Sequence, residues 1–494
     1  MTKPASTVPY AFAKANGVVV TALADGIAEV AVRAGAHSGA LAEVRRAMGV
    51  PLHAWQLGAG EFDQLLSDLY NAADAGAAAL ADDLAQDLDL SRLLQEIPKV
   101  EDLLDARDDA PLIRLINALL TQALREGASD IHIEPFESRL SIRLRVDGVL
   151  RQIMEPPAAI GPLLVSRIKI MAKLDIAEKR VPQDGRISLR IANRPVDVRV
   201  STIPSGSGER VVLRLLDKQA GRLQLEQIGM DATTTAGIDQ IIHLPHGIFL
   251  VTGPTGSGKT TTLYAALARI NDRSRNIMTV EDPIEYYIDG IAQTQVNTKV
   301  DMTFARGLRA ILRQDPDVVM VGEIRDIETA QIAIQASLTG HLVLSTLHTN
   351  SAVGALTRLH DMGTEPFLLA SSLVGVLAQR LVRRLCPHCR QLLTPDAALA
   401  MRLAISHAEL EKHTVYEAAG CAKCMQIGFR GRTAIYEFVS VDKQVRRLIH
   451  DNAGEPTIEA HVRRFSPSLF DNGRDKVLAG DSTAEELIRV TTAN

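Results

Sequence analysis

The spacing of apolar residues changes along the chain and predicts different elements in different segments. Between Leu112 and Leu119 apolar residues recur at helical spacing, and Gly127 marks the end of that helix. Three later segments are expected to be strands, the first two with apolar and polar residues in alternation: 140–146, 196–201 and 210–216. Asp147-Gly148 supplies a turn after the first strand. This α+β pattern places arginines on one sheet face, for which exposure to solvent is the simplest interpretation.

A second pattern begins with the short apolar strand Gly247–Thr252, which runs directly into a glycine-rich loop. The segment after the loop is predicted to be an amphipathic helix, with its apolar residues at Leu263, Ala266, Leu267 and Ile270. Strand, loop and helix in this order form the context that a phosphate-binding loop requires. The apolar stretch Phe367–Ala378 is too short to cross a membrane and is interpreted as a buried helix.

The glycine-rich loop matches the pattern G-x-x-x-x-G-K-[ST] from Gly253 to Thr260. Its glycines let the backbone turn tightly and approach an anion, and the next helix presents free N–H groups and a positive dipole end. Lys259 would reach the β- and γ-phosphates, and the Thr260 hydroxyl would ligate Mg²⁺. The flanking strand and helix argue against a chance turn. We therefore predict that ATP is held by Gly253, Pro254, Thr255, Gly256, Ser257, Gly258, Lys259, Thr260 and Thr261.

Two further strands are predicted to end in carboxylates that suit nucleotide hydrolysis. Val318–Glu323 is an apolar strand that ends in an acid, which is the Walker B arrangement. Thr279–Glu285 offers three acids, at Glu281, Asp282 and Glu285. Any of these carboxylates could orient or deprotonate the attacking water, and each alone would more simply be a structural residue. Beside a P-loop, at least one is expected to be catalytic.

A fourth strand, within 340–350, carries His341 and His348 and several threonines. A single histidine in such a strand would more simply be a hydrogen-bonded core residue. Two histidines close to a P-loop suggest a sensor of the γ-phosphate.

All four cysteines lie in one region as two C-x-x-C pairs, at Cys386, Cys389, Cys421 and Cys424. Thiolates are soft ligands, and two such pairs supply the tetrahedron that structural Zn²⁺ prefers. The gap of 31 residues between the pairs exceeds the usual ribbon spacing. His388 is an alternative ligand, and four free buried cysteines are the alternative to a metal. We predict a structural zinc site, because four thiolates leave no coordination position open.

Charge and hydropathy narrow the class of protein. The formal net charge is −5 and no long basic run occurs, which argues against nucleic acid as a partner. The start, Met1–Tyr10, lacks an apolar core of signal-peptide length, and no stretch reaches the ~18 to 20 apolar residues of a transmembrane helix. We expect a cytoplasmic protein whose membrane contacts go through a partner.

Four of these segments together resemble the Walker A, Asp box, Walker B and His box of the secretion ATPases: Gly253–Thr260, Thr279–Glu285, Val318–Glu323 and Gly340–Asn350. Further matches extend the resemblance over roughly residues 110–440: Glu126–Glu134, Arg145–Gly148, Val181–Arg186 and Gly428–Arg432. One departure is Ala434, where glycine is expected. The resemblance implies a homo-hexameric ATP hydrolase, peripheral to the inner membrane, that drives type II protein secretion or type IV pilus assembly.

The resemblance also implies roles for the acids and histidines. Glu285 resembles the acid that activates water, and Glu323 the acid that holds Mg²⁺ and its water. His341 and His348 resemble relays to the γ-phosphate.

Arginines of two domains resemble residues that approach phosphates in this family. Arg199 and Arg214 of the α+β domain match such positions, which replaces the solvated-face interpretation for these two. Arg309 and Arg313 are further candidates of the same kind. We hypothesise that ATP binding closes the α+β domain, with its arginine pair, onto the P-loop.

The opening motif Pro9–Gly17 and the chain length resemble the type II secretion branch of the family. That branch implies that residues 1–90 dock to the cytoplasmic domain of an inner-membrane secretion protein, while the motor works against an inner-membrane platform protein. Three alternatives stay open at this stage. They are a type IV pilus assembly ATPase, a DNA-transfer ATPase, and a nucleotide-gated scaffold that binds ATP without turnover.

The implied fold is α/β, with a RecA-like P-loop core preceded by a PAS-like α+β domain and a small N-terminal helical or α+β domain. The expected units are an N-terminal recruitment domain at 1–90, a linker at 91–110, the α+β domain at 111–226, the ATPase core at 227–385, a zinc-binding tetracysteine insertion at 386–436, and a C-terminal helical subdomain at 437–494.

Overall fold

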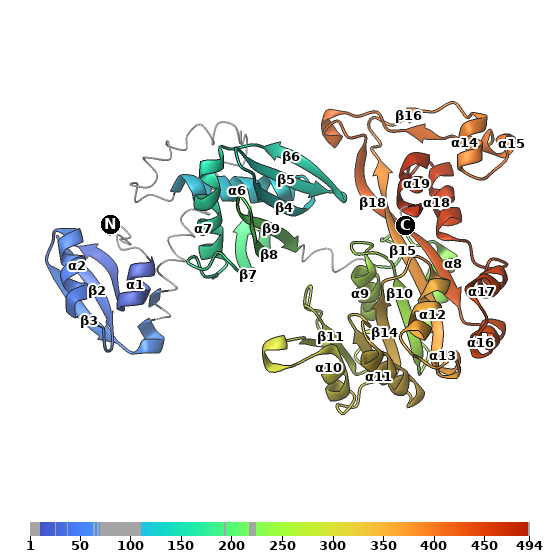
Figure 1. The fold of residues 1–494 in the computed structure, drawn as a ribbon, viewed down its shortest axis with the longest axis horizontal. Coiled ribbons are helices and arrows are strands. Elements are labelled where there is room, and N and C mark those ends of the chain that lie inside the picture. Colours follow the sequence, from blue (N-terminus) through green and yellow to red (C-terminus); the bar gives the residue numbers. More distant parts are fainter. Residues whose placement is uncertain are drawn as a thin grey trace. The chain divides into compact units, whose positions relative to one another are not determined.

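The computed structural model describes residues 10–24, 26–36, 38–62, 65–66, 69, 110–191, 194–216 and 224–492. The chain divides into two compact units, Met1–Leu216 and Asp217–Asn494. Figure 1 shows the elements of both units in chain order, from blue to red. The predicted linker, 91–110, lies outside the described residues except for its last position.

The N-terminal part of the first unit is a small α+β domain on a three-stranded sheet. Strand β1 (Val18–Ala24) is antiparallel to β2 (Ile27–Arg33), which pairs in parallel with β3 (Leu52–Leu57). A parallel pair needs a crossover, and α2 (Ser38–Met48) supplies it. Helix α1 (Tyr10–Asn16) packs beside β1. The domain has an apolar core of its own.

The second part of this unit is a six-stranded antiparallel sheet in the order β6-β5-β4-β9-β8-β7. Helices α6 (Ala110–Arg125) and α7 (Gly161–Met171) share one core with the inward side chains of the strands and cover one face of the sheet. The predicted helix, strands and Asp147-Gly148 turn are confirmed. The strands are β4 (Ala128–Pro135), β5 (Leu140–Val146), β6 (Val149–Met154), β7 (Gln183–Ile191), β8 (Arg194–Ser205) and β9 (Gly208–Leu216).

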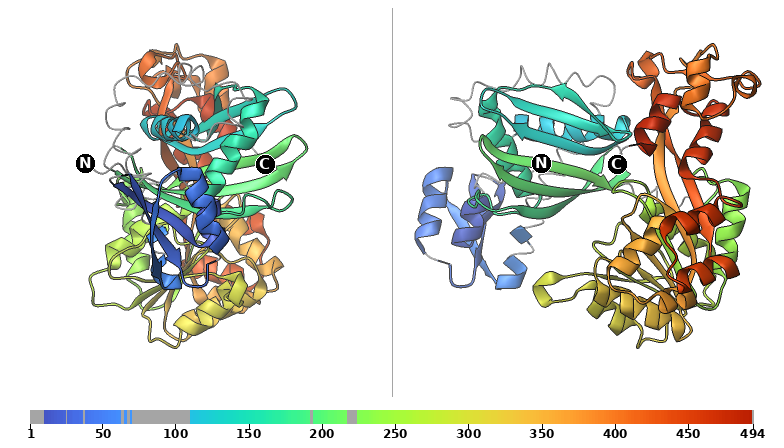
Figure 2. Two further views of the ribbon diagram at one scale, coloured as in Figure 1. Left: turned by 90° about the vertical axis from the view of Figure 1, so that its left-hand side faces the viewer. Right: turned by 45° about the vertical axis from the view of Figure 1, so that its right-hand side comes forward.

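The other face of this sheet, visible as broad arrows in Figure 2, is charged. Asp130 and Glu134 on the central strand β4 are each only 4% exposed. Asp130 accepts a hydrogen bond from Arg214 Nε at 2.9 Å. Glu134 pairs with Arg143 at 2.6 Å and with Arg210 at 2.5 Å. Buried carboxylates therefore hold arginines of the neighbouring strands in fixed orientations, so this face is an ordered network.

The second unit is built on a seven-stranded sheet in the order β12-β11-β13-β14-β10-β15-β18. Six strands are parallel, and β18 is antiparallel to β15. Along β10, Ile248 and Leu250 join one apolar core, and Phe249 and Val251 join the other. The strands are β10 (Gly247–Thr252), β11 (Ile277–Glu281), β12 (Ala292–Gln295), β13 (Val318–Val321), β14 (Leu342–Leu347), β15 (Leu373–Leu385) and β18 (Phe429–Ser440).

Helices cover both faces of the seven-stranded sheet. Helices α8 (Ala232–Ile242) and α9 (Lys259–Ile270) contribute to one core. The opposite core contains residues of α10 (Phe304–Ile311), α11 (Ile327–Leu338), α12 (Ala352–Asp361) and α13 (Pro366–Ser372). A parallel sheet covered by helices on both faces confirms the predicted α/β core.

Strands β15 and β18 form a long antiparallel pair that extends from Gly375 and Ser440 to Leu385 and Phe429. The insertion between them carries β16 (Gln391–Leu392), α14 (Ala397–Arg402), α15 (His407–Leu410) and β17 (Tyr416–Glu417). Four helices follow β18, at α16 (Lys443–His450), α17 (Glu455–Val462), α18 (Leu469–Leu478) and α19 (Ala484–Thr491). Most of β18 falls within the predicted tetracysteine insertion, yet it is a strand of the core sheet.

The predicted buried helix over Phe367–Ala378 is wrong in its second half, because α13 ends at Ser372 and β15 begins at Leu373. Strand β15 lies between β10 and β18 and is buried on both faces, so its sequence lacks the alternation of a half-exposed strand. A continuous apolar run of this length does not distinguish a buried strand from a buried helix. Across the described ranges, the helices are too short or too polar to span a bilayer.

Candidate functional site

The loop Gly253–Gly258 joins the carboxyl end of β10 to α9. Gly253 has a φ of 146°, and a Cβ there would lie 2.3 Å from the backbone oxygen of Gln379. Gly258, the N-cap of α9, has a φ of 88°, and its Cβ would lie 2.8 Å from the Gln379 side-chain nitrogen. The loop therefore follows a path that only glycine permits at these two positions. This path brings the first turn of α9, with its free N–H groups, to the end of the strand.

The Lys259 side chain fills the inside of this loop. Its Nζ donates hydrogen bonds to the carbonyl oxygens of Gly253 at 2.8 Å and Pro254 at 3.2 Å. Burial lowers the pKa of Lys259 to about 8, and the charge of Glu323 opposes this shift. Thr260 is exposed in the first helical turn. A buried ammonium, an exposed hydroxyl and helix N–H groups in one loop fit a nucleotide phosphate with Mg²⁺.

Glu323 and His348 meet beside the P-loop. Glu323 lies two residues beyond β13 and His348 directly follows β14. His348 Nε2 lies 3.4 Å from one carboxylate oxygen of Glu323, and Arg325 pairs with the other. Burial and the charge of Lys259 lower the pKa of His348, while Glu323 opposes them. The structure thus brings three predicted site residues together at the carboxyl edge of the parallel sheet, where ligands bind in such folds.

Glu281, the first of the three acids at the end of β11, is held in a structural network. Its carboxylate is 3% exposed. The Tyr264 hydroxyl donates to Oε2, and Oε1 accepts from Thr279 Oγ1 at 2.5 Å and from Gln293 Nε2 at 3.0 Å. With both oxygens occupied by protein donors, Glu281 is poorly placed to receive a proton from water.

Asp282 and Glu285 lie beyond the end of β11. Asp282 is exposed and Glu285 is half-buried. The backbone N–H of Glu285 lies 3.4 Å from the hydroxyl of Tyr264, which is a residue of α9. The acid that the resemblance assigns to water activation is therefore linked to the helix that begins at the P-loop.

His341 is not brought to this cluster. It precedes β14, whereas His348 follows it, and seven extended residues span about 23 Å. Its Nδ1 lies 2.9 Å from the Ala336 carbonyl oxygen near the end of α11, and its own carbonyl accepts from the Gly247 amide at the start of β10. Within one chain, His341 thus lies at the amino edge of the sheet, opposite the P-loop.

The predicted arginines lie in different surroundings. In the first unit, Arg199 of β8 is directly opposite Arg214 of β9, and Arg214 pairs with Asp130. In the second unit, Arg309 forms an exposed ion pair of 2.6 Å with a glutamate of α11. Arg313 is exposed beyond the end of α10.

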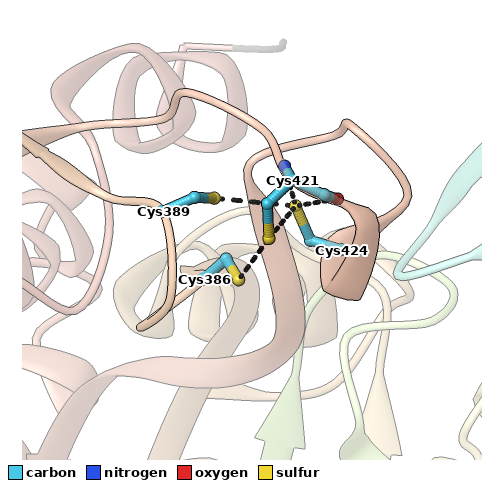
Figure 3. Close-up of side chains that lie close together, drawn as sticks. All are labelled: Cys386, Cys389, Cys421 and Cys424. Carbon is cyan, nitrogen blue, oxygen red and sulfur yellow. Dashed lines mark hydrogen bonds between the residues drawn. The ribbon is translucent and has the colours of Figure 1, made fainter.

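The four cysteines form one cluster at the end of the β15–β18 pair (Figure 3). The Sγ atoms of Cys386 and Cys421 are 3.9 Å apart, and Cys424 Sγ is 3.7 Å from those of Cys389 and Cys421. A tetrahedron with Zn–S bonds of ~2.3 Å has edges of about 3.8 Å, so the spacing fits Zn²⁺. The exposed His388 is outside the cluster.

Backbone amides prepare one of these thiols for ionisation. Cys424 Sγ accepts from the amides of Cys421 and Gly428, both at 3.2 Å. Burial alone would raise the pKa of Cys424, but these amides and the neighbouring thiols lower it to about 6. The donor set is therefore suited to a metal that binds thiolates.

Two buried polar residues at the nucleotide site were missed by the sequence analysis. Gln379 of β15 hydrogen-bonds to the P-loop, and its only signal is that it is the first polar residue after the apolar run Leu373–Ala378. Tyr264 of α9 bonds to Glu281, and nothing in its spacing distinguishes it from a core residue of an amphipathic helix.

Comparisons with known proteins cover almost the whole chain. The family model described as type II/IV secretion system protein matches residues 105–489, and the model of an N-terminal domain of GSPII protein E matches residues 7–70. Type II secretion system protein E of Pseudomonas aeruginosa is 58% identical over 99% of this chain and 97% of its own length. Type II secretion system ATPase E of Vibrio cholerae is 59% identical over 92% of this chain and 90% of its own length.

Solved structures agree with the fold of the ATPase-like part. The pilus retraction motor PilT with bound ADP has a TM-score of 0.52 at 24% identity, over 76% of this chain and 96% of its own. The ATPase DotB of Legionella pneumophila has a TM-score of 0.57 at 21% identity, over 76% of this chain and 94% of its own. Because identity to both is low, they support the fold alone. The family models and the full-length relatives go further, and by them this chain belongs to the type II secretion ATPase E family.

Proposed function

We propose that this chain is the ATP-hydrolysing motor of a type II secretion system, which drives pseudopilus assembly and protein export across the outer membrane. One observation carries the proposal: Lys259, Glu323 and His348 converge at the P-loop of a chain whose full-length relatives bear the name type II secretion system protein E. The match of residues 7–70 to an N-terminal domain of GSPII protein E favours secretion over pilus assembly. The −5 net charge disfavours a DNA-transfer ATPase.

The nucleotide would be held by the loop residues Gly253 to Thr261. Lys259 would bind the β- and γ-phosphates, and Thr260 and Glu323 would hold Mg²⁺, which neutralises charge on the transferring phosphoryl group. Glu285 is the proposed base for the attacking water, because Glu281 already has donors on both oxygens. His348 would sense the γ-phosphate through its contact with Glu323.

Arg199 and Arg214 are proposed to complete the site when the α+β domain closes on ATP. Arginine charge delivered to a developing phosphate charge accelerates P-loop reactions by ~10³ to 10⁵. The register pair formed by these arginines on β8 and β9 supports a joint role. Full activity of Arg199→Ala at saturating ATP would contradict it.

The assembly around this site is also proposed. Four thiolates of the tetracysteine cluster would bind one structural Zn²⁺. A homo-hexamer would convert ATP-driven closure into steps against an inner-membrane platform protein. Residues 1–90 would dock to the cytoplasmic domain of an inner-membrane secretion protein and keep the chain cytoplasmic at that membrane. Membrane recovery that is unchanged after loss of residues 1–90 would argue against this docking.

The proposed reaction is tested by phosphate release from ATP with Mg²⁺. We expect turnover by the wild type, loss of nucleotide binding in Lys259→Ala, and retained binding without turnover in Glu285→Gln. Wild-type binding without phosphate release would favour a nucleotide-gated scaffold. To separate secretion from pilus assembly, the chain would replace type II secretion system protein E in Pseudomonas aeruginosa. Restored export of secreted enzymes supports the proposal, and restored pili in a strain lacking its pilus assembly ATPase would oppose it.

A further inference from the structure

Gln379 is a buried carboxamide on β15, 2% exposed, that contacts the P-loop. Its Nε2 donates to the Ser257 carbonyl oxygen at 2.8 Å, and its Oε1 accepts from Thr262 Oγ1 at 2.7 Å. A carbonyl cannot donate, so the amide nitrogen has to face Ser257 and the amide oxygen has to face the hydroxyl. The two contacts therefore fix the orientation of the side chain without ambiguity.

The contact with Ser257 fixes one peptide unit at the end of the P-loop. In a trans peptide the C=O and the following N–H point in opposite directions. Holding the Ser257 carbonyl on Gln379 therefore turns the Gly258 N–H away from β15. This N–H belongs to the N-cap of α9, where backbone amides bind anions.

The same residue also contacts the start of the loop and the helix after it. Its backbone oxygen lies so close to Gly253 that a Cβ there would come within 2.3 Å. Through Thr262, its side chain also holds the first turn of α9. Gln379 thus touches the beginning of the loop, its end and the following helix, which is more than a core polar residue needs to satisfy its own hydrogen bonds.

Neighbouring arginines fix the strand that carries Gln379. Arg380 donates to Asn350 Oδ1 at 3.0 Å and to the backbone oxygen of Val490. Arg383 donates to the buried Glu486 of α19, from Nε at 3.1 Å and from its terminal nitrogen at 2.8 Å. Strand β15 is therefore anchored to the C-terminal helix on one side and bonded to the P-loop on the other.

We propose that Gln379 is a positioning residue for the P-loop, which holds the Ser257–Gly258 peptide in the orientation that binds phosphate. The inference rests on the proposed nucleotide site and adds to it a residue outside the loop motif. Without the Gln379 donor, the Ser257 peptide is free to rotate, and the loop has to be ordered when the nucleotide binds. The cost falls on binding, so KM for ATP rises more than kcat falls.

The first test is Gln379→Glu, which keeps the size of the side chain and replaces the donor with a second acceptor. We expect its Kd for a fluorescent ADP analogue and its KM for ATP to rise by about tenfold or more, with kcat at saturating ATP lowered less than about threefold. Gln331→Glu, on the exposed face of α11, introduces the same charge and should match the wild type. Thermal unfolding of both variants shows whether they fold.

A second pair of variants keeps the inference testable if a buried glutamate prevents folding. Thr262→Val removes the hydroxyl that orients Gln379, and Thr262→Ser retains it. We expect weaker nucleotide binding in the valine variant and wild-type binding in the serine variant. The Thr262 hydroxyl also bonds to Tyr436, so Tyr436→Phe controls for loss of that contact.

The outcomes separate the inference from the proposed function. A wild type that binds no nucleotide overturns both. A wild type that binds nucleotide, together with a folded Gln379→Glu or Thr262→Val variant of unchanged Kd and KM, overturns the role of Gln379 alone. Equal losses in Thr262→Val and Thr262→Ser would also overturn it, because the serine preserves the hydrogen bond.

Discussion

Replacement of Tyr264 by phenylalanine tests the network that links the P-loop helix to the Asp box. Tyr264 is fully buried, and its hydroxyl donates to a Glu281 oxygen that no other described group contacts through a hydrogen bond. Its ring also packs edge-on against Tyr286, with centroids 4.6 Å apart. Phenylalanine keeps the ring in this packing and removes only the hydroxyl.

The magnitude follows from the charge of the acceptor. A hydrogen bond to a charged group contributes ~1.5–3 kcal/mol, so Tyr264→Phe should lower the free energy of unfolding by about 2 kcal/mol. Tyr436→Phe is the matched control, because its equally buried hydroxyl donates to the neutral carbonyl of Ile228 at 3.1 Å. A neutral hydrogen bond contributes ~0.5–1.5 kcal/mol, so the control should lose about half as much.

Urea denaturation of both variants at one protein concentration measures this difference. Tyr264→Phe should also lower kcat, by up to about tenfold, with KM for ATP nearly unchanged, because the Glu285 backbone loses its contact with α9. If Tyr264→Phe destabilised the protein no more than Tyr436→Phe does, Glu281 would not depend on that hydroxyl and the network would have no structural role. If kcat were unchanged, Tyr264 would not position Glu285.

Three other outcomes are expected. His348→Ala should lower phosphate release at saturating ATP by at least about tenfold, and His341→Ala should lower it less, since His341 lies at the opposite edge of the sheet; equal losses per folded protein would contradict this placement. Cys421→Ser should lose the bound Zn²⁺ in elemental analysis while His388→Ala keeps it, and zinc retained by the serine variant would refute the four-thiolate site. For Glu486, burial alone would raise its pKa, but hydrogen bonds from Arg489 and Arg383 lower it below the usual 4.5, so its stabilising effect is complete above that pH and is lost as the pH falls further. Glu486→Gln should therefore be less stable than the wild type at pH 7, with the gap closing in acid, and a pH-independent gap would disprove the linkage.

Local sequence predicted the P-loop because its chemistry is encoded within one strand, one turn and one helix. The glycine conformations and the buried Lys259 follow directly from the order of residues in that segment. The two histidines show where such reasoning ends. They are close in sequence and belong to one box, but the strand between them separates them by about 23 Å, so only His348 reaches the P-loop edge within the chain.

Strand order explains why Gln379 could not be predicted. The P-loop strand β10 is hydrogen-bonded to β14 and β15, which follow it by about ninety to more than one hundred residues along the chain. Nothing in local periodicity selects these neighbours, and the apolar run at the start of β15 suits a helix equally well. The bond between Gln379 and Ser257 exists only because the sheet places their strands together.

The arginine network of the α+β domain limits how its arginines can reach a phosphate under the proposed function. Asp130 is buried and accepts hydrogen bonds from Arg214 Nε at 2.9 Å and Ser129 Oγ at 2.8 Å, with Arg145 at 3.6 Å. Moving Arg214 away alone would deprive a buried carboxylate of a charged donor, which costs ~1–3 kcal/mol. The Arg214 guanidinium can keep its Nε on Asp130 while its terminal nitrogens face outward, since its side chain is 57% exposed. Closure is therefore best described as movement of the whole domain with its arginines already oriented, so that the sheet, and not the individual side chains, responds to ATP.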